Sequence, residues 1–398
     1  MKKKRILTLC LSFSLIFTLA ESVSFTPKFI LYADAEETVT QDYLTFETFD
    51  DYAVVKSCDK KAKSVIIPSE INGLPVTSIG DYSFSQCSNL EEVIIPESIL
   101  DIGNEVFTYC PNLKEITIPD SVKRLGNGVF AASGITTVTL PNGIRSIGKY
   151  MFAGCDSLNS FIIPDTVIAI GASAFEDCAI SNVTIPDSVT SIGEIAFRGC
   201  KFLSDITLPD TVTKIEKGAF AGCSGLTRIP YLGHINSVEE NVFEDCTGLK
   251  IVTIPDNIMN IEKGAFARCT ELTRIIIPES ITNIDSHALD DCSKLAAIYG
   301  VKGSHAELFA VQQNIPFFDI ILGDLDLNGE VSVEDAQITL KEYVRTMSGL
   351  DCSFTEKQNL AGDVNGDYQI SVEDAQTILL YYVQNSVANM QTTWEDLL

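Results

Sequence analysis

The segment LKEITIPDSVKRLGNGVFAAS, residues 113–133, combines a short strand, a turn and an apolar second half. In its EITIP part apolar and polar residues alternate, which is the pattern of a strand with one buried face. Pro119 ends this strand because proline has no backbone N–H to donate. The Asp-Ser pair that follows favours a turn. Phe130 in the second half is then expected to point into a core.

The same pattern returns along the chain every 22 or 23 residues, as in LKIVTIPDNIMNIEKGAFARC at residues 249–269. A period of this length is typical of stacked repeats, in which one coil cannot bury its apolar face alone but neighbouring coils share a core. The sequence therefore predicts a β-rich solenoid of about ten coils. With strands about 4.8 Å apart, such a rod is about 50 Å long.

Two columns of residues follow this period and are expected to line the core. The cysteines are Cys87, Cys110, Cys155, Cys178, Cys200, Cys223, Cys246, Cys269 and Cys292, with Ser133 in the one missing place. The phenylalanines are Phe84, Phe107, Phe130, Phe152, Phe175, Phe197, Phe220, Phe243 and Phe266. We interpret both as packing residues, the phenylalanines not being a sugar-stacking platform. Disulfides between neighbouring coils remain an alternative, because the coil spacing of about 5 Å permits them.

These repeats resemble the bacterial surface-antigen class of leucine-rich repeat over residues 64–318. VKGSHAELFAVQQNIPF, residues 301–317, reads as an end cap, and YLTFETFDDYAVVKSC, residues 43–58, alternates like two short strands that cap the other end. We assign residues 36–60 to the N-terminal cap and residues 61–318 to the solenoid with its C-terminal cap.

The first 35 residues read as a signal peptide, with a basic start at residues 2–5 and an apolar run from Ile6 to Ala20. Cleavage is expected after Ala35, with Ala20 as the second choice and a membrane anchor as the alternative to a signal. Cleavage after Ala35 removes five of the 28 basic and two of the 54 acidic residues and leaves a net charge of −29. A surface this acidic disfavours nucleic acid and anionic lipid and attracts cations. The sequence predicts an exported protein with no membrane span in its mature chain.

Two similar carboxylate-rich stretches lie near the C-terminus, GDLDLNGEVSVEDAQITLKEYV from Gly323 and GDVNGDYQISVEDAQTILLYYV from Gly362. Side-chain oxygens fall at positions 1, 3, 5, 9 and 12 of each loop, the spacing of an EF-hand calcium loop, in which position 7 contributes its backbone carbonyl. The predicted ligands are Asp324, Asp326, Asn328, Glu330, Ser332 and Asp335, then Asp363, Asn365, Asp367, Gln369, Ser371 and Asp374. We expect two Ca²⁺ ions, because Mg²⁺ prefers a stricter octahedron.

The loops depart from the usual pattern in three ways. Position 12 is Asp rather than Glu, and position 6 is Gly329 in the first loop but Tyr368 in the second. No entering helix is expected before either loop. Ser332 and Ser371 are expected to cap the helices that follow.

Paired loop–helix units of this kind resemble a dockerin, a small all-α module, over residues 323–398; we assign residues 319–398 to it. The resemblance implies calcium-dependent docking onto a cohesin module of a scaffoldin, within a cellulosome-type assembly of an anaerobic bacterium. The cohesin contacts that it implies are Val333, Glu334, Leu340 and Lys341, and in the second copy Val372, Glu373, Leu379 and Leu380. Packing between the two helices is the alternative for the apolar members.

The duplication leaves single or dual docking orientation open, although Lys341 opposite Leu380 breaks the symmetry. The tail QTTWEDLL, residues 391–398, is expected to fold back through Trp394 and Leu397. Only four residues separate Phe318 from Gly323, which predicts restricted motion between the solenoid and the module.

The sequence contains no recognisable catalytic motif: G-x-S-x-G, H-E-x-x-H and the P-loop are missing, and the chain has three histidines. Exposed strand positions are expected to be small or charged, which suits a protein ligand better than cellulose. The sequence therefore predicts a secreted, non-catalytic binding protein, held extracellularly on a cell-surface cellulosome-type complex. The alternatives are a cellulosome-borne enzyme or enzyme inhibitor of polysaccharide degradation, or a structural spacer.

Overall fold

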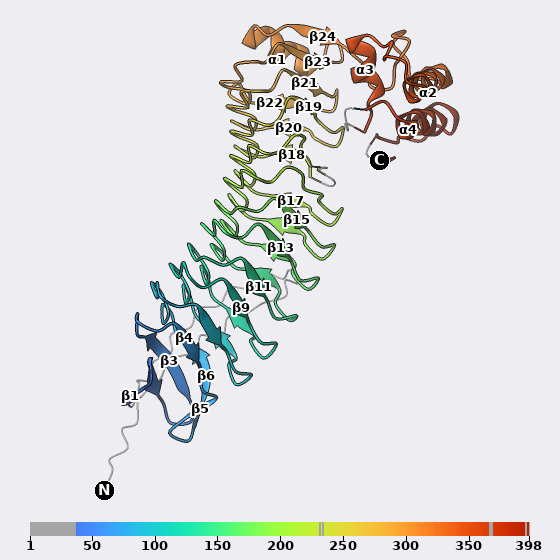
Figure 1. Ribbon diagram of the computed structural model, residues 1–398. Coiled ribbons are helices and arrows are strands. Elements are labelled where there is room, and N and C mark those ends of the chain that lie inside the picture. Colours follow the sequence, from blue (N-terminus) through green and yellow to red (C-terminus); the bar gives the residue numbers. More distant parts are fainter. Residues whose placement is uncertain (1–36, 231, 233–234, 366–368, 395, 398) are drawn as a thin grey trace, which may run out of the picture.

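The computed structural model describes residues 37–397 apart from residues 231, 233–234, 366–368 and 395. The expected signal peptide and both of its cleavage sites lie outside the described residues. The described chain is an elongated stack of coils with a helical module beside its C-terminal end (Figure 1). The stack has about eleven turns, one more than the sequence predicted.

The N-terminal end of the stack begins with strands β1 (Glu37–Gln41), β2 (Leu44–Thr48) and β3 (Ala53–Cys58), which pair in antiparallel fashion. Strands β2 and β3 are those expected over residues 43–58, and β1 precedes them. Strand β3 then pairs in parallel with β6 (Leu74–Ile79), the first strand of the stack on that side. A short antiparallel strand, β5 (Glu70–Ile71), pairs with β6 inside the insertion that opens the repeats.

The coils contribute two rows of short parallel strands, because proline and the turn after it divide each repeat in two. The first row contains β4 (Ser64–Ile66), β7 (Glu92–Ile94), β9 (Glu115–Thr117), β11 (Thr137–Thr139), β13 (Ser160–Ile162), β15 (Asn182–Thr184), β19 (Ile251–Thr253), β21 (Arg274–Ile277) and β23 (Ala297–Gly300). The second row contains β8 (Asp101–Ile102), β10 (Arg124–Leu125), β12 (Ser146–Ile147), β14 (Ala169–Ile170), β16 (Ser191–Ile192), β17 (Lys214–Ile215), β18 (Ser237–Val238), β20 (Asn260–Ile261) and β22 (Asn283–Ile284). Where neighbouring strands of the second row pair, equivalent apolar residues lie side by side, as Ile147 does beside Ile170.

The phenylalanine column lies in the core, as predicted. All nine rings are fully buried, and successive rings are 5.2–5.8 Å apart between centroids. The backbone holds this spacing: the Phe107 N–H donates to the Val129 carbonyl of the next coil at 2.8 Å. Each phenylalanine turn needs left-handed residues, such as Gly128 (φ +62°) and Ala132 (φ +51°) around Phe130. The cysteines of the column are also in the core as free thiols, except that Cys292 at its end is only partly buried.

Helix α1 (His305–Gln313) and strand β24 (Phe317–Asp319) complete the stack, with β24 pairing to β23. The module beyond contains α2 (Val333–Met347), α3 (Glu356–Gly362), α4 (Val372–Tyr382) and the π-helical segment η1 (Val383–Val387). The expectation that no helix precedes either loop is wrong for the second loop, because α3 leads directly into Asp363. A capping box between Thr355 and Gln358 starts this seven-residue helix.

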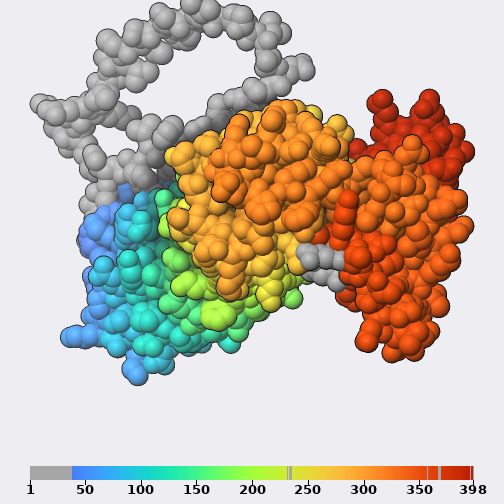
Figure 2. All heavy atoms as spheres, turned by 90° about the horizontal axis from the view of Figure 1, so that it is seen from above, coloured from blue at the N-terminus to red at the C-terminus, as the bar shows by residue number. Residues whose placement is uncertain are grey.

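The module packs against the side of the last coils and forms a separate lobe in the view from above (Figure 2). Ile276 and Tyr299 from the solenoid share an apolar cluster with Ile320 and with Leu325 and Trp394 of the module. This contact favours restricted motion, which stays a prediction. The expected return of the tail is confirmed for Trp394, which is buried and stacks on Tyr381 with ring centroids 3.9 Å apart.

Candidate functional site

The first carboxylate loop, residues 324–335, brings three acidic side chains together at the start of α2. Oxygens of Asp324, Asp326 and Asp335 lie within 4.8 Å of one another. Asp335 is fully buried and accepts backbone N–H groups of Leu325 at 2.7 Å and Asp326 at 3.0 Å. Its second oxygen accepts the N–H and the hydroxyl of Ser332, both at 2.8 Å. The loop thus fixes its position-12 carboxylate beside the two carboxylates of positions 1 and 3.

The other end of the first loop is held by the carboxylate of Asp324. This carboxylate accepts the N–H groups of Asn328 at 3.0 Å and Gly329 at 2.9 Å. Burial raises the pKa of Asp324, and the two N–H groups act in the opposite direction. Gly329 has φ +95°, so the turn needs glycine at the position where the sequence places one. Glu330 at position 7 is exposed, and its N–H donates to the Asn328 side-chain oxygen at 2.8 Å.

The second loop repeats this arrangement as far as it is described. Asp374 is fully buried, and its carboxylate accepts N–H groups of Val364 at 3.1 Å and Ser371 at 2.8 Å. Asp363 and Asn365 stand at positions 1 and 3, and Gln369 at position 7 is exposed. The predicted ligand Asp367 and the variant position Tyr368 lie outside the described residues.

Both loops end in the helix caps that the sequence predicted. The Ser332 hydroxyl accepts the Glu334 N–H, and the Ser371 hydroxyl accepts those of Glu373 and Asp374, each within a capping box. The loops offer only oxygen donors, which suits a hard cation such as Ca²⁺ rather than a softer metal. Carboxylates this close repel one another unless a positive charge lies between them. The residues present therefore fit a divalent cation.

The residues predicted to contact a partner lie on α2 and α4. The buried residues of these helices are Asp335, Ala336, Thr339 and Glu342 on α2, and Asp374, Ala375, Thr377 and Ile378 on α4. Leu340, Leu379 and Leu380 are instead 41–43% exposed. The remaining predicted contacts are the half-buried Val333 and Val372 and the exposed Glu334, Lys341 and Glu373. Part of each of these three leucines is therefore open to solvent, and packing between the helices stays the alternative for the rest of each side chain.

Sequence reasoning missed further apolar side chains that extend this surface. Val344 and Met347 on α2 are 55% and 70% exposed, and Val383 and Val387 follow α4. Residues 340, 344 and 347 are spaced as one helix face, a signal that was present in the sequence. We call Leu340, Val344, Met347, Leu379, Leu380, Val383 and Val387 the module's apolar surface.

The first row of strands presents the solenoid's most regular exposed surface. Side chains alternate along each strand, so Phe161 is buried while Ile162 beside it is 89% exposed. Ile66 and Ile94, which are register partners on β4 and β7, are also exposed. The expectation that this surface is only small or charged is therefore wrong, because a strand with three successive apolar residues must turn one of them outward.

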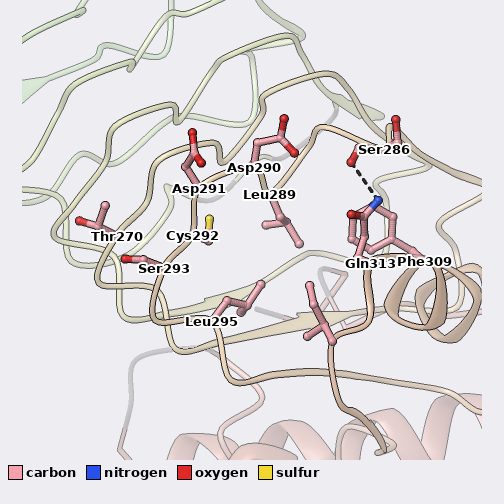
Figure 3. A pocket seen from close by; sticks show the side chains of 11 residues that line it. Thr270, Ser286, Leu289, Asp290, Asp291, Cys292, Ser293, Leu295, Phe309 and Gln313 are labelled. Carbon is pink, nitrogen blue, oxygen red and sulfur yellow. Dashed lines mark hydrogen bonds between the residues drawn. The ribbon is translucent and has the colours of Figure 1, made fainter.

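A pocket of about 480 Å³ lies between the last coil and α1 (Figure 3). It opens where the phenylalanine column ends: Leu289 takes the place of phenylalanine, and Phe309 of α1 lines the opposite side. The Gln313 amide donates to the Ser286 carbonyl at 3.0 Å across its edge. Burial raises the pKa of Cys292 in its wall to about 11, so this thiol is not activated as a nucleophile.

The stacked coils, with two rows of short strands around one apolar core, define a leucine-rich-repeat solenoid. The family model described as BspA type leucine-rich repeat region matches residues 48–181 and 168–296, with six copies. The chain therefore belongs to the BspA-type leucine-rich repeat family. The surface antigens of this family are extracellular or cell-surface proteins, and no catalytic family is indicated.

Solved structures of leucine-rich repeat proteins are similar to this chain. A leucine-rich cell surface protein from Faecalibacterium prausnitzii A2-165 is 27% identical, with 70% of this chain and 98% of that chain covered and a TM-score of 0.38. A leucine-rich repeat protein from Bacteroides ovatus ATCC 8483 is 22% identical, with 71% and 99% covered and a TM-score of 0.43. The pneumococcal vaccine antigen PcpA is 15% identical, with 72% and 99% covered and a TM-score of 0.47.

No curated protein matches the chain. Within the described part of the chain, none of the helices has the length and apolar character needed to cross a membrane.

Proposed function

We propose that this protein is a secreted, non-catalytic adaptor of a cell surface. Its solenoid binds a protein ligand, and its C-terminal module is a dockerin that attaches the chain to a cohesin module of a scaffoldin in a cellulosome-type complex. Attachment depends on two Ca²⁺ ions, one in each carboxylate loop. The observation that carries the proposal is the pair of matching twelve-residue loops, each closed by a buried aspartate at the start of a helix.

The arrangement of the first loop supports cation binding. Asp324, Asp326 and Asp335 would supply carboxylate oxygens, with Asn328, Ser332 and the Glu330 carbonyl completing the set that the sequence predicts. The bound ion would supply positive charge and cross-link the start of the loop to the start of α2. In the second loop Asp363, Asn365, Asp367, Gln369, Ser371 and Asp374 would act in the same way.

The module's apolar surface supports a docking role, because exposed leucine, valine and methionine side chains on adjoining helices favour a partner interface. The predicted contacts Val333, Glu334, Lys341, Val372 and Glu373 lie on the same two helices. Lys341 and Leu380 occupy equivalent places in the two copies. A partner that binds a positive charge at this place would therefore prefer one of the two docking orientations.

The first strand row supports ligand binding by the solenoid. Ile66, Ile94 and Ile162 are exposed apolar side chains on a surface of threonine, serine and charged residues, and exposed apolar groups with a polar rim favour a protein partner. The module covers this row at its C-terminal end, where Ile276 of β21 enters the shared apolar cluster. The open part of the row therefore lies toward the N-terminal coils.

The attachment role is tested by titrating the full chain with CaCl₂ in a calorimeter, then measuring its binding to a panel of scaffoldin cohesins with and without EDTA. We expect two binding events and cohesin binding only with Ca²⁺. Leu340→Asp combined with Leu379→Asp should abolish cohesin binding and leave the calcium heats unchanged. Leu308→Asp, on an exposed residue of α1, is the matched control. Cohesin binding unaffected by EDTA would overturn the proposal.

The ligand role is tested by capture from culture supernatant with the immobilised full chain. Ile162→Asp should remove a captured protein other than scaffoldin, while Met259→Asp, an exposed residue away from the first row, should not. Capture of scaffoldin alone would instead identify a structural spacer. Turnover of plant polysaccharides by the purified protein would identify the enzyme alternative.

A further inference from the structure

The first cysteine of the column differs from all those after it. Eight column cysteines donate their thiol to a phenylalanine carbonyl of an earlier coil at 2.9–3.2 Å, as Cys200 does to Phe175. Cys87 opens the column, and the N-terminal cap below it has no phenylalanine turn. Its sulfur lies instead 4.0 Å from the carbonyl of Cys58. Cys87 therefore lacks the bond that fixes its successors.

Cys58 is the last residue of β3, at the N-terminal end of the stack (Figure 1), and it is held directly beside Cys87. The Cys58 N–H donates to the Ser83 carbonyl at 2.7 Å, which ties the cap to the first phenylalanine turn. The contact of the Cys87 sulfur with the Cys58 carbonyl makes the two cysteines direct neighbours across the joint between cap and coil. Both residues are buried, so the pair is enclosed between cap and coil.

A lysine completes the cluster. The Lys60 ammonium lies 3.9 Å from the Cys87 sulfur and also donates to the Ser85 carbonyl. The other ionisable groups that act on Cys87 are Asp59 of the cap and, in the next coil, Cys110. A cation beside one member of a buried thiol pair stabilises the thiolate of that member.

The neighbouring Cys58 thiol, with the charge of Lys60, lowers the pKa of Cys87 to about 7 in spite of burial. The neighbouring Cys87 thiol raises the pKa of Cys58, as does burial. Along the column burial raises the pKa of Cys155 to about 11 and that of Cys200 to about 12. Of the two neighbouring thiols, Cys87 is therefore the one that ionises more readily.

We propose that Cys58 and Cys87 are an oxidisable dithiol that hydrogen peroxide converts into a disulfide between the N-terminal cap and the first coil. The Cys87 thiolate attacks one oxygen of peroxide, the O–O bond breaks, and hydroxide leaves and takes a proton to become water. The sulfenic acid on Cys87 is then attacked by the Cys58 sulfur, which loses its proton, and a second water leaves. Two thiols and one peroxide give one disulfide and two waters.

The test is peptide mapping of the reduced full chain carrying Cys352→Ser, which removes an exposed thiol able to link two molecules. The protein is treated with hydrogen peroxide from pH 5.5 to 8.5, then denatured and alkylated. We expect a linked Cys58–Cys87 peptide, two hydrogens lighter than the free pair, whose rate of formation rises through about pH 7 as Cys87 ionises. The remaining column cysteines should be alkylated.

Variants distinguish the cysteine that attacks peroxide from the cysteine that then attacks the sulfenic acid. Cys58→Ser should leave Cys87 as a sulfenic acid that dimedone traps, and Cys87→Ser should abolish both products. Cys110→Ser, in the next coil of the same column, is the matched control and should form the link at the normal rate. Lys60→Gln, at an exposed residue, should slow the link roughly two- to tenfold, because each pKa unit changes the thiolate fraction tenfold below the pKa.

Two results would overturn the proposal. One is full alkylation of both Cys58 and Cys87 after peroxide treatment. The other is linkage elsewhere in the column at the same rate. Because wild-type mapping and Lys60→Gln require no change to a buried residue, these outcomes can be read even if a cysteine variant fails to fold.

Discussion

Phe197 in the middle of the solenoid and Asp335 in the module are both fully buried, yet they stabilise their surroundings by different physics. Phe197 lies between identical rings, 5.2 Å from Phe175 and 5.5 Å from Phe220 between centroids. Asp335 is a charge surrounded by N–H donors and by two other carboxylates. The solenoid is stabilised by apolar contact between neighbouring coils, whereas the module also buries carboxylates that lie close to one another. The two regions should therefore respond to different perturbations.

Removal of divalent cations should separate the two regions most strongly. The chain has one tryptophan, Trp394, which is buried in the module, so its fluorescence reports on the module alone. We expect EDTA to shift its emission to the red and lower the module's melting temperature, while the far-ultraviolet circular dichroism of the strands persists. Equal loss of both signals would show that the regions are not independent.

Asp335→Ala should reproduce this loss in the presence of Ca²⁺. It leaves the N–H groups of Leu325, Asp326 and Ser332 without an acceptor, at a cost of about 3 kcal/mol or more in module stability. Asp351→Asn, at an exposed carboxylate between α2 and α3, removes the same charge and should cost less than about 0.5 kcal/mol. Denaturant titration followed by Trp394 fluorescence measures both variants. Equal effects would show that charge number, not position, governs the module.

Phe197→Ala should destabilise the solenoid rather than the module. It removes a ring from the stack and should destabilise the solenoid by about 3–5 kcal/mol, because the coils on either side cannot close the cavity. Phe202→Ala, 65% exposed in the same coil, is the matched control and should change stability by less than about 0.5 kcal/mol. Denaturation followed by circular dichroism gives both values, and EDTA should alter neither. A small effect of Phe197→Ala would mean that the coils repack.

The repeat was predictable because the pattern that specifies each coil lies within 22 or 23 consecutive residues and recurs in many coils. Alternation, the proline that ends each strand and the inward phenylalanine recur in coil after coil, so an error in one is corrected by the others. The approach of Asp324, Asp326 and Asp335 to one another was predictable for a similar reason, since oxygen spacing within twelve residues is a local property; the binding of Ca²⁺ there stays a prediction. The helix caps at Ser332 and Ser371 follow from the same local chemistry.

What the sequence did not predict depends on contacts between distant segments. The packing of Trp394 and Leu325 against Ile276 and Tyr299 joins residues at least 26 positions apart. Helix α3 has only seven residues, too short for a clear apolar period. The exposure of Ile162 depends on which residue of an apolar run faces inward. The environment of Cys87 required knowing that the cap places Cys58 and Lys60 beside it.

Acidification should weaken the module through Glu342, whose carboxylate is buried on α2 and accepts the N–H and the hydroxyl of Ser353. Burial opposes its charge, but the two bonds outweigh burial and hold the pKa of Glu342 below its usual range. A folded-state pKa below the unfolded value of about 4.3 gives stability that is present at higher pH and is lost as pH falls through the folded pKa.

Glu342→Gln should therefore cost about 1–2 kcal/mol of module stability at pH 7 and progressively less below about pH 4. Denaturant titrations at fixed Ca²⁺, followed by Trp394 fluorescence, measure the difference. Glu279→Gln, at an exposed turn of the solenoid, is the control and should have no such pH dependence. A cost that stays constant down to pH 3 would show that shape, not charge, holds Ser353.

The smallest expected effect concerns charge on the solenoid surface. Arg228 and Asp205 form a two-point ion pair between adjacent coils, with nitrogen–oxygen distances of 3.2 and 2.9 Å. The arginine holds the pKa of Asp205 below its usual range, but about half of each side chain is exposed to solvent.

A double-mutant cycle with Arg228→Ala and Asp205→Ala should give a coupling of about 0.2–1 kcal/mol in low salt. In 1 M NaCl the coupling should fall toward zero because the Debye length shrinks to about 3 Å. A coupling above about 2 kcal/mol that persists in salt would mean that charge stabilises the solenoid as it does the module.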